Sequence, residues 1–270
     1  MKRLMLAGAL LVAGATAVLA QPTGQAGAAP PAQPAPPKGP APKSQAELTA
    51  LQAMISASQG TDQDAAIKAA EDVRANFPDT DFKELSLDIE AQAYQRKGDW
   101  IKAQIFAEEA LKANPKSFQA TLMLADLLSQ HTAEHDLDRD EKLSKAEGYA
   151  KSAIDLINAA PKPNSQITDE QWEGAKKSMI GQAWHDIALS NSTKKNWDAA
   201  IAAFKTAITN DDQPAYKTQM ADALQKSGKN DEAIAMCDQV LATPNLHPMI
   251  QNACNNIKKI ATAAKANAAK

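Results

Sequence analysis

The side chains best suited to bind a metal ion form a short acidic stretch near the middle of the chain. Asp136, Asp138 and Asp140 alternate along it. Glu147 is the twelfth residue counted from Asp136. Carboxylates at these intervals are the ligands of a twelve-residue calcium loop, which also needs glycine at its sixth position for a sharp turn. Glu141 stands at that sixth position, so calcium binding is one interpretation of the stretch and not a complete match.

The same residues also fit the start of a helix. Asp138 suits the N-cap position, and Glu141, three residues later, would complete a capping box. The helix would then run through "EKLSKAEGYAKSAIDLI". In this interpretation Glu147 lies along the helix and does not reach an ion held by the earlier aspartates.

Two histidines offer a second kind of metal site beside the acidic stretch. His131 and His135 are four residues apart, so on one helical turn they could bind zinc, nickel or copper, with Glu134 or Asp136 completing the site. Two histidines near an exposed helix end are more often solvated. The alternative function is therefore a calcium- or transition-metal-responsive protein that uses residues 131–147, and the main expectation is a protein without a cofactor.

Cys237 and Cys254 are the only two cysteines in the chain. An even number of cysteines is typical of exported proteins with disulfides. A bridge between them would close a loop of 17 residues and stabilise the fold by roughly 3 kcal/mol. Two buried free thiols are the alternative, and the sequence leaves both states open.

Motifs of the common catalytic sites are absent from the sequence. It has no G-x-S-x-G nucleophile elbow, no phosphate-binding glycine loop, no HExxH and no cysteine with a matched base. Carboxylates are frequent, but at helical spacing they are typical of solvated faces. We therefore expect a non-enzymatic protein.

Charge and aromatic content argue against nucleic acid as a partner. The chain has 29 Lys and Arg residues against 32 Asp and Glu residues, a net charge of −3. Proteins that bind nucleic acid or anionic membranes usually carry a basic field. Only 4% of the residues are aromatic, which also disfavours stacking on bases.

The amino-terminal 43 residues differ in composition from the rest. Residues 1–20 begin with Lys2 and Arg3, continue in an apolar run and end in small residues, which is the pattern of a secretory signal peptide. A membrane-spanning helix is the weaker interpretation because the run is short and interrupted by glycine. Residues 21–43 are rich in Pro, Gly and Ala and predict a disordered linker. We expect residues 44–270 to fold in the periplasm or outside the cell, with no membrane insertion after the signal is cleaved.

The elements that would position these side chains are predicted to be helices. After residue 44 Ala, Leu, Lys, Gln and Glu dominate, and no strand-like alternation occurs. Five segments share the pattern A-x3-(A/F/C)-x2-(A/V)-(L/I), and their first alanines are 37, 43, 54 and 33 residues apart. The pattern picks out Ala66, Ala70, Val73 and Pro78; Ala103, Ala107, Ala110 and Leu111; Ala146, Ala150, Ala153 and Ile154; Ala200, Phe204, Ala207 and Ile208; and Ala233, Cys237, Val240 and Leu241.

These units resemble the tetratricopeptide repeat family, whose 34-residue helix-turn-helix units have small residues at positions 8 and 20 and larger ones around them. The second unit matches with Leu87, Ala91, Tyr94, Gly98, Trp100, Ala103, Ala110 and Pro115; the fourth with Trp184, Ala188, Trp197, Ala200, Phe204 and Ala207; and the fifth with Ala221, Gly228, Ala233 and Val240.

The resemblance implies an all-α fold, a right-handed α-solenoid of about five such repeats. Ala91 and Ala103 would let two helices approach closely, while Tyr94 and Trp100 fill the flanking space. Gly98 would take the left-handed conformation that ends a helix. The two long spacings imply insertions of 9 and 20 residues that lengthen a helix or a loop. A last helix is predicted to cap the array with an apolar stripe of Met249 or Ile250, Ala253, Ile257 and Ile260.

The resemblance also implies a partner-binding groove lined by the first helix of each unit. The implied lining is polar, rich in glutamine and of mixed charge, and it suits an extended peptide or a helix of another protein. We therefore expect a protein-protein interaction scaffold of the bacterial cell envelope. Carbohydrate binding through exposed Trp172 and Trp184 is a further alternative. The implied groove residues are Asp88, Gln92, Gln95, Arg96, Gln119, Asp126, Ser129, Gln130, Gln182, His185, Ser192, Thr218, Asp222, Gln225 and Lys226.

Overall fold

The computed structural model describes residues 39–164 and 166–268, and the predicted signal peptide and the linker up to residue 38 lie outside this part. Within it the chain forms eleven helices and no strand. No helix in this part is both long and apolar enough to cross a membrane. The helices are α1 (Gln45–Gln59), α2 (Gln63–Asn76), α3 (Lys83–Lys97), α4 (Trp100–Ala113), α5 (Phe118–His131), α6 (Arg139–Ala159), α7 (Asp169–Thr193), α8 (Trp197–Asn210), α9 (Pro214–Lys226), α10 (Asn230–Leu241) and α11 (Pro248–Ala268).

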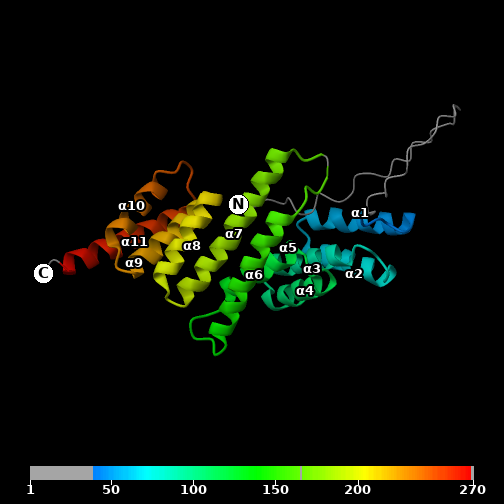
Figure 1. Ribbon diagram of the computed structural model, residues 1–270, viewed down its shortest axis with the longest axis horizontal. Helices are drawn as coiled ribbons and strands as arrows, with labels where there is room; N and C mark the ends of the chain where they lie inside the picture. Colours follow the sequence, from blue (N-terminus) through cyan, green and yellow to red (C-terminus); the bar gives the residue numbers. More distant parts are fainter. Residues whose placement is uncertain (1–38, 165, 269–270) are drawn as a thin grey trace, which may run out of the picture.

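The helices pair into five successive hairpins followed by one further helix. Each odd-numbered helix from α1 to α9 packs on the even-numbered helix that follows it, and each hairpin packs on the next. Figure 1 shows the helices laid out in chain order along the long axis, from α1 at one end to α11 at the other. The predicted all-α solenoid is therefore confirmed.

The repeated small residues lie inside the array, as the pattern predicted. An alanine side chain is short enough for two helix backbones to pack at close range. The small residues therefore allow close helix packing and do not fill a large space. The last position of the pattern is half-buried in four units, and Pro78 follows the end of α2. The residues of the pattern that are at most 1% exposed are Ala66, Ala70, Val73, Ala103, Ala107, Ala110, Ala146, Ala150, Ala153, Ala200, Phe204, Ala207, Ala233, Cys237 and Val240.

The turn of the second hairpin has the predicted conformation, but one of its aromatic residues does not pack as expected. Gly98 has a φ of 77°, in the left-handed region. Tyr94 stacks on Phe106 with 5.4 Å between ring centroids. Trp100, by contrast, is 40% exposed and stacks on His131 of the next hairpin at 4.0 Å. Trp100 therefore bridges two units instead of filling space within its own.

The two insertions lengthen both helices and loops. Helices α6 and α7 have 21 and 25 residues, against 12 to 15 in the other hairpin helices. Figure 1 shows both of them extending beyond their neighbours in the middle of the array. Thr168 caps α7 with a reciprocal capping box to Gln171, which fixes where the added turns begin.

The last helix caps the array with a face slightly different from the predicted stripe. Cys254, Ile257 and Ala261 are buried against the preceding hairpin. Met249 is 73% exposed and Ile260 is 43% exposed. The buried face therefore follows residues 254, 257 and 261, because successive helical contacts are three or four residues apart.

Candidate functional site

A pocket of about 360 Å³ lies where the first helices of the third, fourth and fifth hairpins meet. Helix α7 contacts α5 directly, and α9 closes the opposite side. No acidic or lysine or arginine side chain lines the pocket, which is dominated by hydroxyl and amide groups. Its lining consists of Ser129, Gln130 and Thr132 from α5 and its end, His185, Leu189, Ser192 and Thr193 from α7, and Ala215, Tyr216 and Gln219 from α9.

His185 joins the two helices on either side of this pocket. Its ring stacks on the Tyr216 ring with 4.4 Å between centroids and an interplanar angle of 21°. Its Nε2 atom donates a hydrogen bond to Gln219 Oε1 at 2.6 Å. Its Nδ1 atom lies 3.6 Å from a carboxylate oxygen of buried Asp186. The imidazole is thus held on three sides, and it gives the pocket a rigid polar and aromatic wall.

The sequence identified part of this pocket. Of the implied groove residues, Ser129, Gln130, His185 and Ser192 line it together. Leu189, Thr193 and Ala215 occupy the same groove-facing repeat positions. Leu189 and Ala215 were missed because they lack the polar or charged character expected of a lining, and Thr193 was missed although its hydroxyl has that character. Tyr216 and Gln219 lie at other positions of the repeat, which the alignment does not assign to the groove.

Three of the implied groove residues that do not line this pocket are also buried. Asp126 accepts a hydrogen bond from Gln95 at 2.9 Å and another from Gln130. Thr218 donates to Pro214 O and lies 3.5 Å from the sulfur of Cys254. Asp88 is 6% exposed. The other implied residues are half-buried or exposed outside this pocket: Gln92, Gln95, Arg96, Gln119, Gln182, Asp222, Gln225 and Lys226.

Asp88 is the most perturbed carboxyl group of this set. Its Oδ1 atom is buried and has no hydrogen-bond partner within the described residues. Burial raises its pKa to about 8, and the nearby negative charge of Glu84 contributes to the rise. The side chain is therefore a buried acid within the array.

The acidic stretch does not form the calcium loop. Asp138 pairs with Lys142 at 2.9 Å and Asp140 with Arg139 at 2.9 Å. Glu147 lies on α6, where it pairs with a lysine of the α7–α8 turn. In residues 39–164 and 166–268 no three His, Cys, Asp or Glu side chains come together as a metal site would require. The carboxylates pair with lysine and arginine side chains, and Lys142 pairs with both Asp136 and Asp138, so their spacing in sequence does not become a common centre.

The histidine pair is also separated by the fold. Helix α5 ends at His131, whose ring stacks on Trp100, and partial burial lowers its pKa. His135 follows in the exposed loop, so the two rings do not share a helical turn. The predicted helix start is confirmed in position, since α6 begins at Arg139, but its capping box is not formed because Asp138 makes no side-chain cap hydrogen bond.

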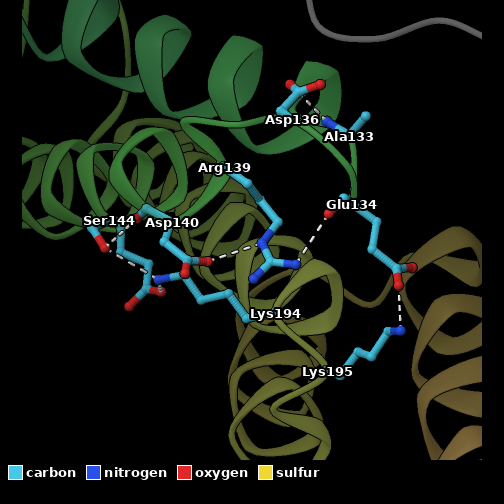
Figure 2. Close-up of polar contacts among 9 residues, drawn as sticks. Ala133, Glu134, Asp136, Arg139, Asp140, Ser144, Lys194 and Lys195 are labelled. Atoms are coloured by element: carbon cyan, nitrogen blue, oxygen red, sulfur yellow. Dashed lines mark hydrogen bonds and ion pairs between the residues drawn. The ribbon is translucent and has the colours of Figure 1, made fainter.

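The inserted loop between α5 and α6 instead lies against the turn between α7 and α8. Glu134 forms an ion pair with Lys195, and Lys194 Nζ is 2.8 Å from Glu147. Arg139 donates to the backbone oxygen of Glu134 at 3.1 Å. Figure 2 shows these contacts converging from the loop and from the turn. We call this arrangement the lysine clasp, defined by Glu134, Glu147, Lys194 and Lys195.

The lysine clasp uses a residue in an uncommon backbone conformation. Lys195 has a φ of 62°, at the repeat position where Gly98 has 77° and Gly228 has 83°. A residue with a Cβ atom is strained there by about 1–2 kcal/mol relative to glycine. The turn is therefore strained by a lysine where glycine would fit, and the lysine places its ammonium group beside the inserted loop.

Changing Lys195→Gly is expected to raise the free energy of unfolding by about 0.5–1 kcal/mol. Relief of the left-handed strain exceeds both the added entropy of a flexible glycine and the loss of an exposed ion pair. Urea unfolding measures the change. Lys195→Ala is the matched control, because it removes the ammonium group and keeps the Cβ; equal stability of the two variants would contradict the strain.

The aromatic residues proposed for carbohydrate binding do not form an exposed platform. Trp172 is 7% exposed, with Lys176 Nζ 6.0 Å from the centre of its ring. Trp184 is half-buried and packs against the main hydrophobic core. Trp172 is therefore buried, whereas the sequence analysis placed it at the surface.

No protein-family model matches the sequence, and no curated protein does. Among solved structures, the chain is similar to one described as the MamA RS-1 ArsTM double mutant, with 12% identity, a TM-score of 0.55, and coverage of 73% of this chain and 94% of that one. It also matches TTC0263, a thermophilic tetratricopeptide repeat protein of Thermus thermophilus, with 16% identity, a TM-score of 0.48, and coverage of 78% and 98%. The hairpin geometry and the first of these matches show that the chain has a helical-repeat fold of the tetratricopeptide type.

Proposed function

We propose that this protein is a non-enzymatic interaction scaffold that binds an extended peptide or a helix of a partner protein in the pocket between α5, α7 and α9. The single observation that carries the proposal is the composition of that pocket. Three hairpins contribute to it, and its lining offers hydrogen-bond donors and acceptors without charged carboxylate, lysine or arginine groups. The fold supports the proposal because stacked helical hairpins present extended binding surfaces.

The chemistry of the pocket suits a peptide more than an ion. Gln130 and Gln219 each carry an amide that can donate and accept, as a peptide backbone does. Ser192 and Thr193 add hydroxyl groups, and the stacked Tyr216 ring provides an apolar surface. A partner would therefore be recognised through backbone amides and one apolar or aromatic side chain.

The proposed location is the periplasm or the exterior of a bacterial cell. Support for it comes from residues 1–20, which have the charged start, apolar centre and small-residue end of a signal peptide. The intact mass of the protein recovered from its own cells tests this location. Loss of residues 1–20 is expected, and a full-length cytosolic protein would contradict export.

A site-specific photo-cross-linker at Gln130, an exposed residue of the pocket rim, tests the binding site in the source cells. The full chain is compared with Ala215→Phe, which fills the pocket, and with Ala202→Phe, the same change at an exposed position of α8. We expect a cross-linked partner with the unmodified chain and with Ala202→Phe, and a loss of about tenfold or more with Ala215→Phe. Thermal unfolding confirms that both variants are folded. Equal cross-linking in all three chains, or none in any, would contradict binding in this pocket.

A further inference from the structure

The chain places its only two cysteines beside each other at one end of the array. Cys237 belongs to α10 and Cys254 to α11, and both side chains are fully buried. Both belong to the same hydrophobic core cluster, and α10 packs directly on α11. The structure therefore shows a dithiol pair at the contact between the capping helix and the last hairpin.

The position of this pair distinguishes it from ordinary core packing. At the repeat position of Cys237 the other units have Ala70, Ala107, Ala150 and Phe204, so packing alone does not require a thiol. The residue opposite is the only other cysteine, so just one pairing within the chain is open to it. Two independent positions, one in a repeat and one in the cap, thus supply the partners of a single bond.

We propose that Cys237 and Cys254 form a disulfide that joins α11 to α10, and that the structure described here is the reduced state of this pair. In the reaction one S–S bond forms between the two sulfur atoms, and the two thiols give up two electrons and two protons. An oxidised dithiol or oxidised glutathione accepts them, and its own disulfide is reduced to two thiols. This inference goes beyond the proposed scaffold function and does not depend on it.

The surroundings of the pair determine how fast the bond forms. Burial raises the pKa of the Cys237 thiol to about 12, and the neighbouring Cys254 contributes to the rise. Thiolate is therefore scarce near neutral pH while α11 is packed. Helix α11 is the last described helix and packs mainly on α9 and α10, so it can open without unfolding the other hairpins. Oxidation accordingly proceeds through transient opening of the cap.

The bond would change how the array ends. In the reduced protein α11 is held by its apolar face of Cys254, Ile257 and Ala261. A covalent link across a loop of 17 residues restricts the unfolded cap and so favours the packed one. The redox state of the compartment then sets the stability of the last hairpin, whose helix α9 also forms one wall of the candidate pocket.

The experiment uses the full chain, purified in reductant and then equilibrated with oxidised and reduced glutathione. We expect a mass loss of roughly 2 Da, no thiol open to maleimide after denaturation, and a rise in Tm of about 6–12 °C on oxidation. Urea below the unfolding transition is expected to speed the reaction by opening α11.

Cys254→Ala is the matched control, and its Tm is expected not to rise with the same treatment. If that variant does not fold, the comparison of reduced and oxidised unmodified chain still decides the question. Two thiols that both react with maleimide at equilibrium would overturn the proposal. A glutathione adduct on each cysteine, or a disulfide between two chains, would also overturn it.

Discussion

Replacing Phe204 by Ala is expected to lower the free energy of unfolding by about 3–5 kcal/mol. Phe204 is the largest side chain that is fully buried among the described residues, and it belongs to a core cluster that extends from α5 to α11. Its ring centroid lies 6.0 Å from that of His185, so it also supports the wall of the candidate pocket. Removing the ring loses the hydrophobic free energy gained by burying it. It also leaves a cavity among alanines that are too short to fill it.

Urea unfolding followed by circular dichroism measures this loss, and Ile101→Ala is the control. Ile101 is 76% exposed, so its truncation is expected to change stability by less than about 0.5 kcal/mol. Hydrogen exchange adds a spatial test. The cluster of α1, α2 and α3 is separate from the one around Phe204, so protection should fall in α7–α10 and persist in α2. A uniform loss along the array would contradict this separation.

The repeated hairpins could be predicted because one physical requirement recurs in each of them. Close helix contact needs small residues at fixed intervals. Ala103, Ala107 and Ala110 therefore indicate a close helix contact, as do the residues at the same positions of the other units. The insertions break this regularity. Trp172 lies in the first part of α7, outside the repeat pattern, so the sequence did not indicate that its side chain would be buried.

The candidate pocket could be predicted only in part for a related reason. Repeat positions say which way a side chain points from its own helix, and they correctly placed His185 and Ser192 at the pocket. They do not say how closely the next hairpin approaches. Asp126 and Thr218 occupy groove-facing repeat positions, yet both are buried and in contact with Gln95 and Cys254 of neighbouring helices.

Ligand spacing in sequence assumes that the carboxylates are free to converge, and within the described residues they do not come together as a metal site would require. The acids pair with cations instead, such as Asp138 with Lys142 and Glu147 with Lys194. A carboxylate can reach a lysine on a neighbouring turn without the tight chain turn that a calcium loop needs. Glu141, at the position where that loop needs glycine, would disfavour such a turn. The lysine clasp therefore depends on residues near 195 that lie far from the acidic stretch in sequence.

Replacing Asp88 by Asn is expected to remove a large pH dependence of stability. The pKa of Asp88 is about 8 in the folded protein, against 3.8 for an ordinary aspartate, because burial disfavours the charged form. Between these values the folded state holds one more proton than the unfolded state. The stability that Asp88 contributes is therefore present below about pH 4 and is lost as the pH rises through about 8.

The difference in unfolding free energy between Asp88→Asn and the unmodified chain measures this effect. It is expected to grow in favour of Asn by about 1.4 kcal/mol per pH unit between roughly pH 5 and pH 7, and to level off above pH 8. Asp72→Asn, at an exposed position of α2, is the control and should show little such growth. A difference that is flat with pH would mean that Asp88 is already ionised in the folded protein. The carboxyl group would then need a compensating partner, and the first place to seek one would be the side of α3 that faces the groove.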